Sequence, residues 1–286
     1  MEQLQIQMSQ ATKSFYSADY EESKIIFEQL LKVYSKKNDT RNVVRCLYRL
    51  CCLAYTRGQI SQFHALLKKY KEALTEELLA LPEHLIEYEM LLAIQALTQL
   101  TYSKAIPHFS KVVMLSQNTK YKKQKISALL FIQKCQIILG NAEQAITTSN
   151  SIWDDYYDVM KEDTQQYLHY VLNRAYAFMQ LNCMEEFEVT IRLCEQHPDF
   201  HLLLKEQVFT AILRAKQHAI NNHHIQAIKL LKGALAKYED FQDAEMLYMM
   251  FSALIDYYEH IQQHKEALHY AKKLMGLQRS IAMHST

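Results

Sequence analysis

The thirteen histidines of this 286-residue chain are the side chains best suited to metal ligation or acid–base chemistry. Two pairs have a four-residue separation, His197 with His201 and His260 with His264. Each pair spans an expected turn, so its two rings do not share one helix face, and no carboxylate or cysteine completes a tetrahedral set at a recognised spacing. The sequence therefore predicts no metal site and no cofactor.

Cysteines and carboxylates give no catalytic pattern either. Adjacent carboxylates at Asp154-Asp155 and Glu185-Glu186 lie near expected helix starts, where they favour the helix dipole rather than face each other across a cleft. A phosphate-binding glycine loop, a nucleophile elbow and a zinc-protease helix motif are all missing from the sequence. We expect no catalytic residue and no enzyme. The six cysteines lack metal-ligand spacing and are expected to be free thiols in a reducing cytoplasm: Cys46, Cys51, Cys52, Cys135, Cys183 and Cys194.

Charge and hydropathy exclude two classes of partner. The 32 Lys and Arg nearly cancel the 31 Asp and Glu, which leaves a formal charge of +1 and no field to attract nucleic acid or an anionic membrane. The most basic run, residues 120–125 (KYKKQK), is interpreted as a solvated face. Apolar runs fall short of the ~20 residues of a membrane span, and the N-terminal residues do not resemble a signal peptide. We expect a cytoplasmic protein.

A recurring helical pattern organises the chain. Residues 222–235 consist of a turn followed by a helix, with Ala227 as a small residue at the base of an apolar stripe, and equivalent positions recur at intervals of 40 or 42 residues. The seven anchors are Ser23, Phe63, Ala105, Ala145, Phe187, Ala227 and Ala267. Five residues earlier lie the expected turn positions Ala18, Gly58, Leu100, Gly140, Asn182, Asn222 and Gln262. Twelve residues earlier lie Ala11, Cys51, Ala93, Gln133, Ala175, Ala215 and Ile255. Small residues at both places let two helices cross closely, and with only 4 Gly and 3 Pro the chain is expected to be all-α.

Three of these units carry the motif of a known family. Residues 18–23 (ADYEES), 140–146 (GNAEQAI) and 264–268 (HKEAL) resemble the tetratricopeptide repeat (TPR), although that repeat has about 34 residues. Long, degenerate repeats of this kind resemble the sensor domains of Gram-positive peptide-pheromone regulators. The resemblance implies a right-handed α-solenoid of about seven helical hairpins, or about 14 helices. The whole chain, 1–286, is expected to be one solenoid domain with repeats at about 5–37, 40–80, 83–117, 121–159, 163–197, 202–238 and 243–283.

Two local expectations accompany this register. The second helix of repeat two is predicted to run over residues 60–79 without a break. The single tryptophan, Trp153, lies in an apolar stripe of repeat four and is interpreted as a packing residue rather than a ligand platform.

Family geometry places the functional surface on the concave side, which the first helix of each repeat lines. The residues predicted there for peptide or protein binding are Arg45, Tyr48, Glu87, Lys134, His169, Tyr176, Lys216 and Asp256, together with Cys52, Met90, Leu172 and His260. Aromatic anchors with isolated charges of both signs suit a peptide held by pockets and a few hydrogen bonds. The leading hypothesis is a non-enzymatic regulator or adaptor that binds a peptide or protein segment in this groove and acts by conformational change.

Two alternatives remain open. The last helix continues beyond its apolar stripe without a shielding element, so the chain is alternatively a sensory or dimerisation module of a larger bacterial signalling protein such as a nucleotide cyclase or kinase. A homodimer through the terminal repeats fits the same feature. A purely structural scaffold that joins two proteins is the other alternative.

Overall fold

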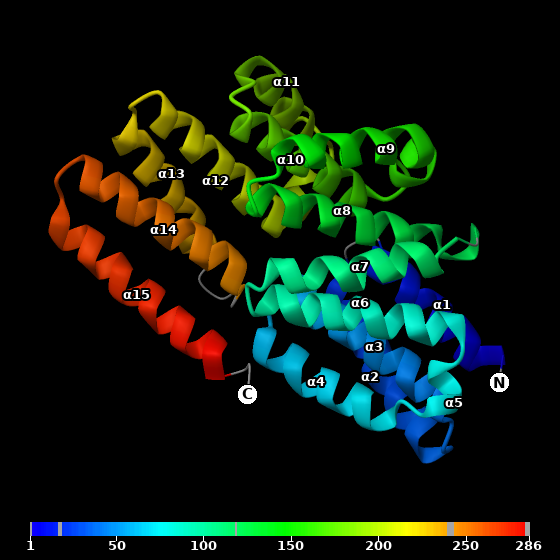
Figure 1. Cartoon of the computed structure of the whole chain (residues 1–286). Helices are drawn as coiled ribbons and strands as arrows, with labels where there is room; N and C mark the ends of the chain where they lie inside the picture. Colours follow the sequence, from blue (N-terminus) through cyan, green and yellow to red (C-terminus); the bar gives the residue numbers. More distant parts are fainter. Residues whose placement is uncertain (1, 17–18, 118, 239–242, 284–286) are drawn as a thin grey trace.

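Every regular element of the described chain is a helix. The computed structural model describes residues 2–16, 19–117, 119–238 and 243–283. The first helices of the hairpins are α1 (Glu2–Tyr16), α3 (Thr40–Thr56), α6 (Pro82–Thr98), α8 (Lys122–Ile138), α10 (Thr164–Gln180), α12 (Leu204–Ile220) and α14 (Ala244–His260). The second helices are α2 (Tyr20–Lys36), α4 (Ile60–Ala73), α7 (Tyr102–Leu115), α9 (Ala142–Met160), α11 (Met184–Glu195), α13 (His224–Lys237) and α15 (His264–Met283). Short pieces complete the set: α5 (Glu76–Leu79) and two 3₁₀ turns, η1 (Thr119–Tyr121) and η2 (Phe200–Leu202). The predicted all-α solenoid of seven hairpins is confirmed (Figure 1).

The hairpin turns share one backbone device. Six predicted turn positions have positive φ, from 55° at Leu100 to 83° at Gly140, while Ala18 lies outside the described residues. After each of the six, the next amide donates to a carbonyl five residues earlier, as from Thr101 to Ala96 at 2.9 Å. This is the Schellman closure, which satisfies carbonyls that the helix end leaves without a partner. The interval of 40 or 42 residues in the sequence is therefore the spacing between successive copies of the same turn.

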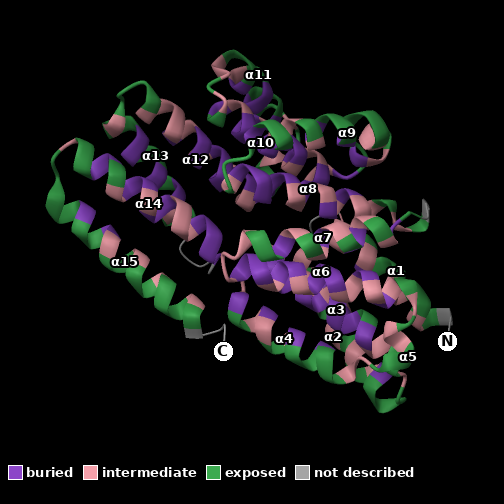
Figure 2. Ribbon diagram, in the orientation of Figure 1, coloured by how far each residue is buried: buried purple, intermediate pink, exposed green. Residues whose placement is uncertain are grey.

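The anchor positions are where the two helices of a hairpin cross. All seven anchors are buried, six of them completely, and Ala267 is 4% exposed. In the first hairpin the Ser23 hydroxyl donates to the Ala11 carbonyl at 2.9 Å, which joins the two predicted close-approach positions directly. The first helices carry most of the core, whereas α15 and the outer faces of α4, α9 and α11 are exposed (Figure 2). In the described part of the chain, no helix is long and apolar enough to span a membrane.

One predicted helix is wrong. The helix expected over residues 60–79 ends at Ala73, because Leu74 takes an extended conformation with ψ 113°. The Thr75 hydroxyl then accepts the amide of Leu78 at 3.3 Å and begins the separate helix α5. A hydroxyl that caps a new helix start competes with continuation of the old helix.

The superhelix curls back on itself. Helix α14 contacts α6, although the two lie in the third and seventh hairpins (Figure 1). The turn at Gly58 meets the residue that precedes α14: a Cβ on Gly58 would lie 3.0 Å from the backbone nitrogen of Asp243. The second hairpin therefore touches the seventh at a point where only a hydrogen fits.

Two glycine substitutions test this contact against a matched control. Gly58 and Gly140 both have positive φ, but a Cβ on Gly140 would meet nothing within 4 Å. Gly140→Ala is expected to cost about 1–2 kcal/mol in the free energy of unfolding, the strain of a left-handed L-residue. Gly58→Ala is expected to lose about 1–3 kcal/mol more through overpacking against Asp243. Chemical denaturation measures both, and equal losses would contradict the contact.

Candidate functional site

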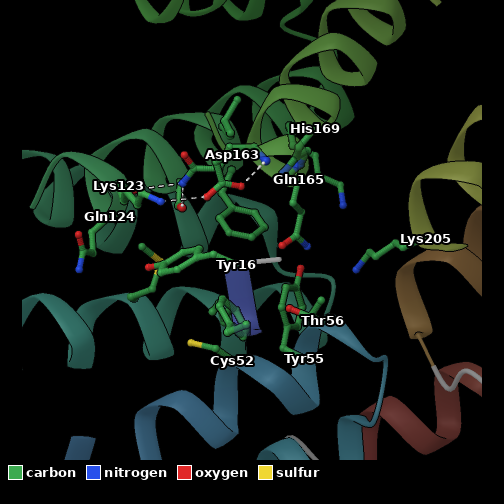
Figure 3. A pocket seen from close by; sticks show the side chains of 18 of the residues that line it. Tyr16, Cys52, Tyr55, Thr56, Lys123, Gln124, Asp163, Gln165, His169 and Lys205 are labelled. Carbon is green, nitrogen blue, oxygen red and sulfur yellow. Dashed lines mark hydrogen bonds and ion pairs between the residues drawn. The ribbon is translucent and has the colours of Figure 1, made fainter. Parts of the chain in front are cut away.

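The curled solenoid surrounds a partly open cavity of about 160 Å³ (Figure 3). Its wall is built from the first helix of every hairpin. The lining residues are Phe15 and Tyr16 from α1; Tyr48, Arg49, Cys52, Tyr55 and Thr56 from α3; Met90 and Ile94 from α6; Lys123, Gln124, Ser127, Leu130, Phe131 and Lys134 from α8; Asp163, Gln165, Gln166, His169 and Leu172 from the start and body of α10; Lys205, Glu206 and Phe209 from α12; and Met246 from α14. Every repeat therefore contributes to the lining of this cavity.

Three helices present polar residues to the cavity at one repeat position. Lys123 and Gln124, Gln165 and Gln166, and Lys205 and Glu206 lie at intervals of 42 and 40 residues and form the first turns of α8, α10 and α12. The first turns of α8 and α10 bond to each other, since the Gln166 amide donates to the Lys123 carbonyl at 3.1 Å. The sequence analysis missed this stripe, although a polar pair recurring with the repeat period could have revealed it.

Some polar side chains of the cavity wall form no hydrogen bond with the rest of the described chain. Among the described residues no hydrogen bond links the side chains of Gln124, Gln165 or His169 to another group, and all three line the cavity (Figure 3). Each side chain can both donate and accept a hydrogen bond. Half-buried groups of this type are most stable when a partner occupies the space they face.

One end of the cavity is formed by contacts between distant repeats. Lys134 bonds Glu245 at 2.6 Å across 111 residues, and both side chains are buried. Lys205 bonds Asp243 at 2.6 Å, and Asp243 also abuts Gly58. We refer to these contacts of Asp243 and Glu245 with Gly58, Lys134 and Lys205 as the closure. They hold α14 against α3, α8 and α12 and so complete the wall.

The charges of the closure set the ionisation of their neighbours. Burial opposes ionisation of Asp243, but the ammonium of Lys205 beside it holds the pKa of that carboxyl below its usual range. Burial, helped by the positive charges of Lys134 and Lys205, lowers the pKa of His169 to about 3. The imidazole of His169 is therefore neutral near pH 7, with one ring nitrogen free to donate and the other to accept.

The predicted groove residues fall in four places. Tyr48, Lys134 and His169 line the cavity, as do Cys52, Met90 and Leu172. Tyr176, Lys216, Asp256 and His260 instead line an open cleft at the C-terminal ends of α10, α12 and α14. Arg45 lies in a groove between α1 and α3. Glu87 lines none of these three and pairs with His84 at 3.2 Å.

Two further expectations about side chains need correction, those for Lys123 and for the Asp154-Asp155 pair. Lys123, expected on a solvated face, lines the cavity and lies 4.2 Å from the centre of the Tyr16 ring. Asp154 and Asp155 lie in the body of α9 rather than near its start. Trp153 does pack, against Tyr157 at 4.2 Å between ring centres, but its side chain remains 43% exposed.

The histidine pairs have separate surroundings. His201 bonds the Pro198 carbonyl at 2.8 Å, while His197 packs against the Tyr167 ring. His260 stacks on His224 with ring centres 4.6 Å apart. Within the described ranges no group of three or more His, Cys, Asp or Glu is placed to hold a metal ion.

Comparison with known proteins gives low-identity matches among solved structures. No protein-family model and no curated protein matches it. A thermophilic TPR protein of Thermus thermophilus is 18% identical over 70% of this chain and 98% of its own, with a TM-score of 0.45. A Rap protein complexed with Competence and Sporulation Factor is 11% identical over 99% of each chain, with a TM-score of 0.46. The assignment of fold and site rests on the helices and side chains of this chain itself.

The closure predicts a specific pattern of stability losses. Lys134→Met leaves the Glu245 carboxylate buried without its partner and is expected to lower the free energy of unfolding by about 3–5 kcal/mol. Replacing both, as Lys134→Met with Glu245→Leu, should restore most of that loss because no buried charge remains. Arg41→Met, in an ion pair with a 56% exposed guanidinium, should cost less than about 1 kcal/mol and is the control. A double variant no more stable than Lys134→Met would contradict this account.

The lowered pKa of His169 predicts that the free energy of unfolding decreases as the pH falls. Below pH ~6.5 the unfolded chain protonates this imidazole, whereas the folded protein does so only near the lowered pKa of about 3. Its contribution should therefore decrease the free energy of unfolding as the pH falls from ~6.5 towards 3 and leave stability unaffected above ~6.5. His169→Phe should flatten this part of the pH–stability curve. Titration of the His169 ring signals by NMR above pH ~5 would refute the prediction.

Proposed function

We propose that the chain is a non-enzymatic binding protein whose cavity holds a short peptide or the end of a protein segment. The observation that carries the proposal is a partly open cavity that all seven repeats line, with side chains that form no hydrogen bond within the described part of the chain. The amides of Gln124 and Gln165 and the neutral ring of His169 offer donors and acceptors of the kind that peptide groups require. Aromatic rings such as Tyr48 and Phe131 supply the apolar area.

The chemistry of the wall suits binding rather than catalysis. Cys52 is the cysteine that lines the cavity, and burial raises the pKa of its thiol to about 11. A protonated thiol is a poor nucleophile. All six cysteines are free, and unpaired thiols suit the reducing cytoplasm in which we place the protein.

The proposed mechanism is a shift between more open and more closed solenoids. A ligand that contacts helices from α1 to α14 binds best when those helices surround it, so it favours the closed arrangement. When the solenoid closes, the second helices shift and the outer surface that they form changes shape. We propose that a signalling partner binds this surface. The role is that of a regulator or adaptor.

Filling the cavity tests this proposal. Thr56 lines the cavity at the end of α3, whereas Thr147 is exposed on α9, so Thr56→Phe and Thr147→Phe are matched variants. Retention of a randomised pool of peptides of two to six residues is measured by equilibrium dialysis and mass spectrometry. Thr56→Phe should reduce retention at least tenfold, since the ring occupies the ligand space, and Thr147→Phe should not change it. Equal retention by both variants, or none by the unaltered protein, would overturn the proposal.

A further inference from the structure

The groove between α1 and α3 has a strongly positive lining. Its volume is about 750 Å³, and it adjoins the cavity, with which it shares Tyr16 and Arg49. Its positive residues are Lys13 on α1 and Arg41, Arg45 and Arg49 on α3. Among the described residues no Asp or Glu belongs to the lining. We refer to this groove as the arginine groove, and its charge favours an anionic partner.

Two of the three arginines have no carboxylate partner. Arg45 is exposed, and in the described part of the chain its guanidinium forms no ion pair. The Arg49 guanidinium donates to the Tyr16 hydroxyl at 3.4 Å, and no described carboxylate neutralises it. Arg41 pairs with Glu83 at 2.7 Å, but its side chain is 56% exposed, so this pair is weak. An incoming carboxylate therefore breaks no buried ion pair.

The three arginines form a row along α3 with a regular spacing. They lie four residues apart, and an α-helix rises 1.5 Å per residue, so successive arginines are about 6 Å apart along the axis. In an extended chain the side chains on one face recur every second residue, at intervals of about 6.4–6.8 Å. Three acidic side chains at alternate positions of an extended segment therefore match the row to within about 2 Å over its length.

The uncharged part of the lining also suits an extended segment. The backbone amides and carbonyls of an extended chain need hydrogen-bond partners, whereas a helix satisfies its own. Gln5 and Ser9 line the groove, and among the described residues their side chains form no hydrogen bond. The Thr12 hydroxyl donates to the Met8 carbonyl at 2.8 Å, which leaves its oxygen free to accept an amide. The wall formed by α1 therefore offers partners to a peptide backbone.

A nucleic acid fits the arginine groove less well than an acidic polypeptide. Single-stranded nucleic acids are usually held by aromatic rings on which their bases stack. Of the two rings in the lining, that of Tyr34 is only 4% exposed. The ring of Tyr16 is in contact with Arg49 and Lys123, at 5.8 and 4.2 Å from its centre. The formal charge of +1 on the whole chain also provides no long-range attraction for a polyanion.

We propose that the arginine groove binds an extended acidic segment of a partner protein, with carboxylates at alternate positions on Arg41, Arg45 and Arg49. This is a second site, and it does not depend on the ligand proposed for the cavity. A guanidinium presents a fork of donors that matches a carboxylate, and charge-assisted bonds of this kind are the strong ones.

A synthetic heptapeptide of alternating serine and glutamate, SESESES, tests the site. It is labelled with a fluorophore, and both of its ends are blocked so that only the side chains carry charge. Fluorescence anisotropy should show binding that weakens as salt is added. The same peptide with glutamine in place of glutamate should bind at least tenfold more weakly. Equal binding of the two peptides, no binding of either, or tighter binding of a single-stranded oligonucleotide would overturn the proposal.

Charge reversal on α3 then tests the register. Arg45→Glu should weaken binding of the heptapeptide at least tenfold. Arg279→Glu changes the net charge equally on the exposed face of α15 and should change binding less than twofold. A heptapeptide with lysine in place of its central glutamate should bind Arg45→Glu better than the original heptapeptide does, which also shows that the variant is folded. Equal effects of the two variants, or failure of this charge swap, would overturn the proposed row of contacts.

A cavity variant separates this inference from the proposed function. Thr56 lines the cavity but not the arginine groove, so Thr56→Phe should leave heptapeptide binding unchanged. Loss of heptapeptide binding in Thr56→Phe would show that the heptapeptide occupies the cavity, and would overturn the second site.

Discussion

The buried ion pair between Lys134 and Glu245 is the constraint on which the cavity depends. Each charge alone would cost several kcal/mol to remove from water, and their attraction offsets this only while the pair is intact. The pair joins α8 to α14, and Asp243 adds a cap on α14 together with its bond to Lys205. An open solenoid has contacts only between neighbouring repeats. This chain adds a long-range bond, and that bond turns a concave face into an enclosed space.

The wall of the cavity combines polar and aromatic side chains. The first turns of α8, α10 and α12 bring lysines, glutamines and Glu206 to the wall. The third and second hairpins contribute later positions of their first helices, such as Ile94 and Thr56. The lining thus moves along the helices as the superhelix advances. A ligand would therefore contact the later residues of the first helices in the N-terminal repeats and the earlier residues of the first helices in the C-terminal repeats.

Local features were predictable from the sequence and non-local features were not. The turn at Leu100 was predicted from the repeat period alone, although leucine has no preference for positive φ. The break before Thr75 escaped prediction because a hydroxyl cap competes with a continuing apolar pattern. Lys134 was predicted on the concave side, where it lies, but its bond to Glu245 depends on how far the superhelix turns. The total turn of the superhelix is the sum of small rotations between successive hairpins. The spacing of residues in the sequence does not reveal this sum.

The separation of 111 residues between Lys134 and Glu245 also sets the order in which the ribosome delivers them. At synthesis rates of about 5–20 residues per second, Lys134 emerges from the ribosome roughly 6–22 seconds before Glu245 does. During that interval the first five hairpins can stack in order, but the ammonium of Lys134 must stay hydrated and the inner face must stay open. The Lys134–Glu245 bond therefore cannot form until the start of α14 has been synthesised. A ligand present during this interval would meet the wall residues before the chain surrounds them.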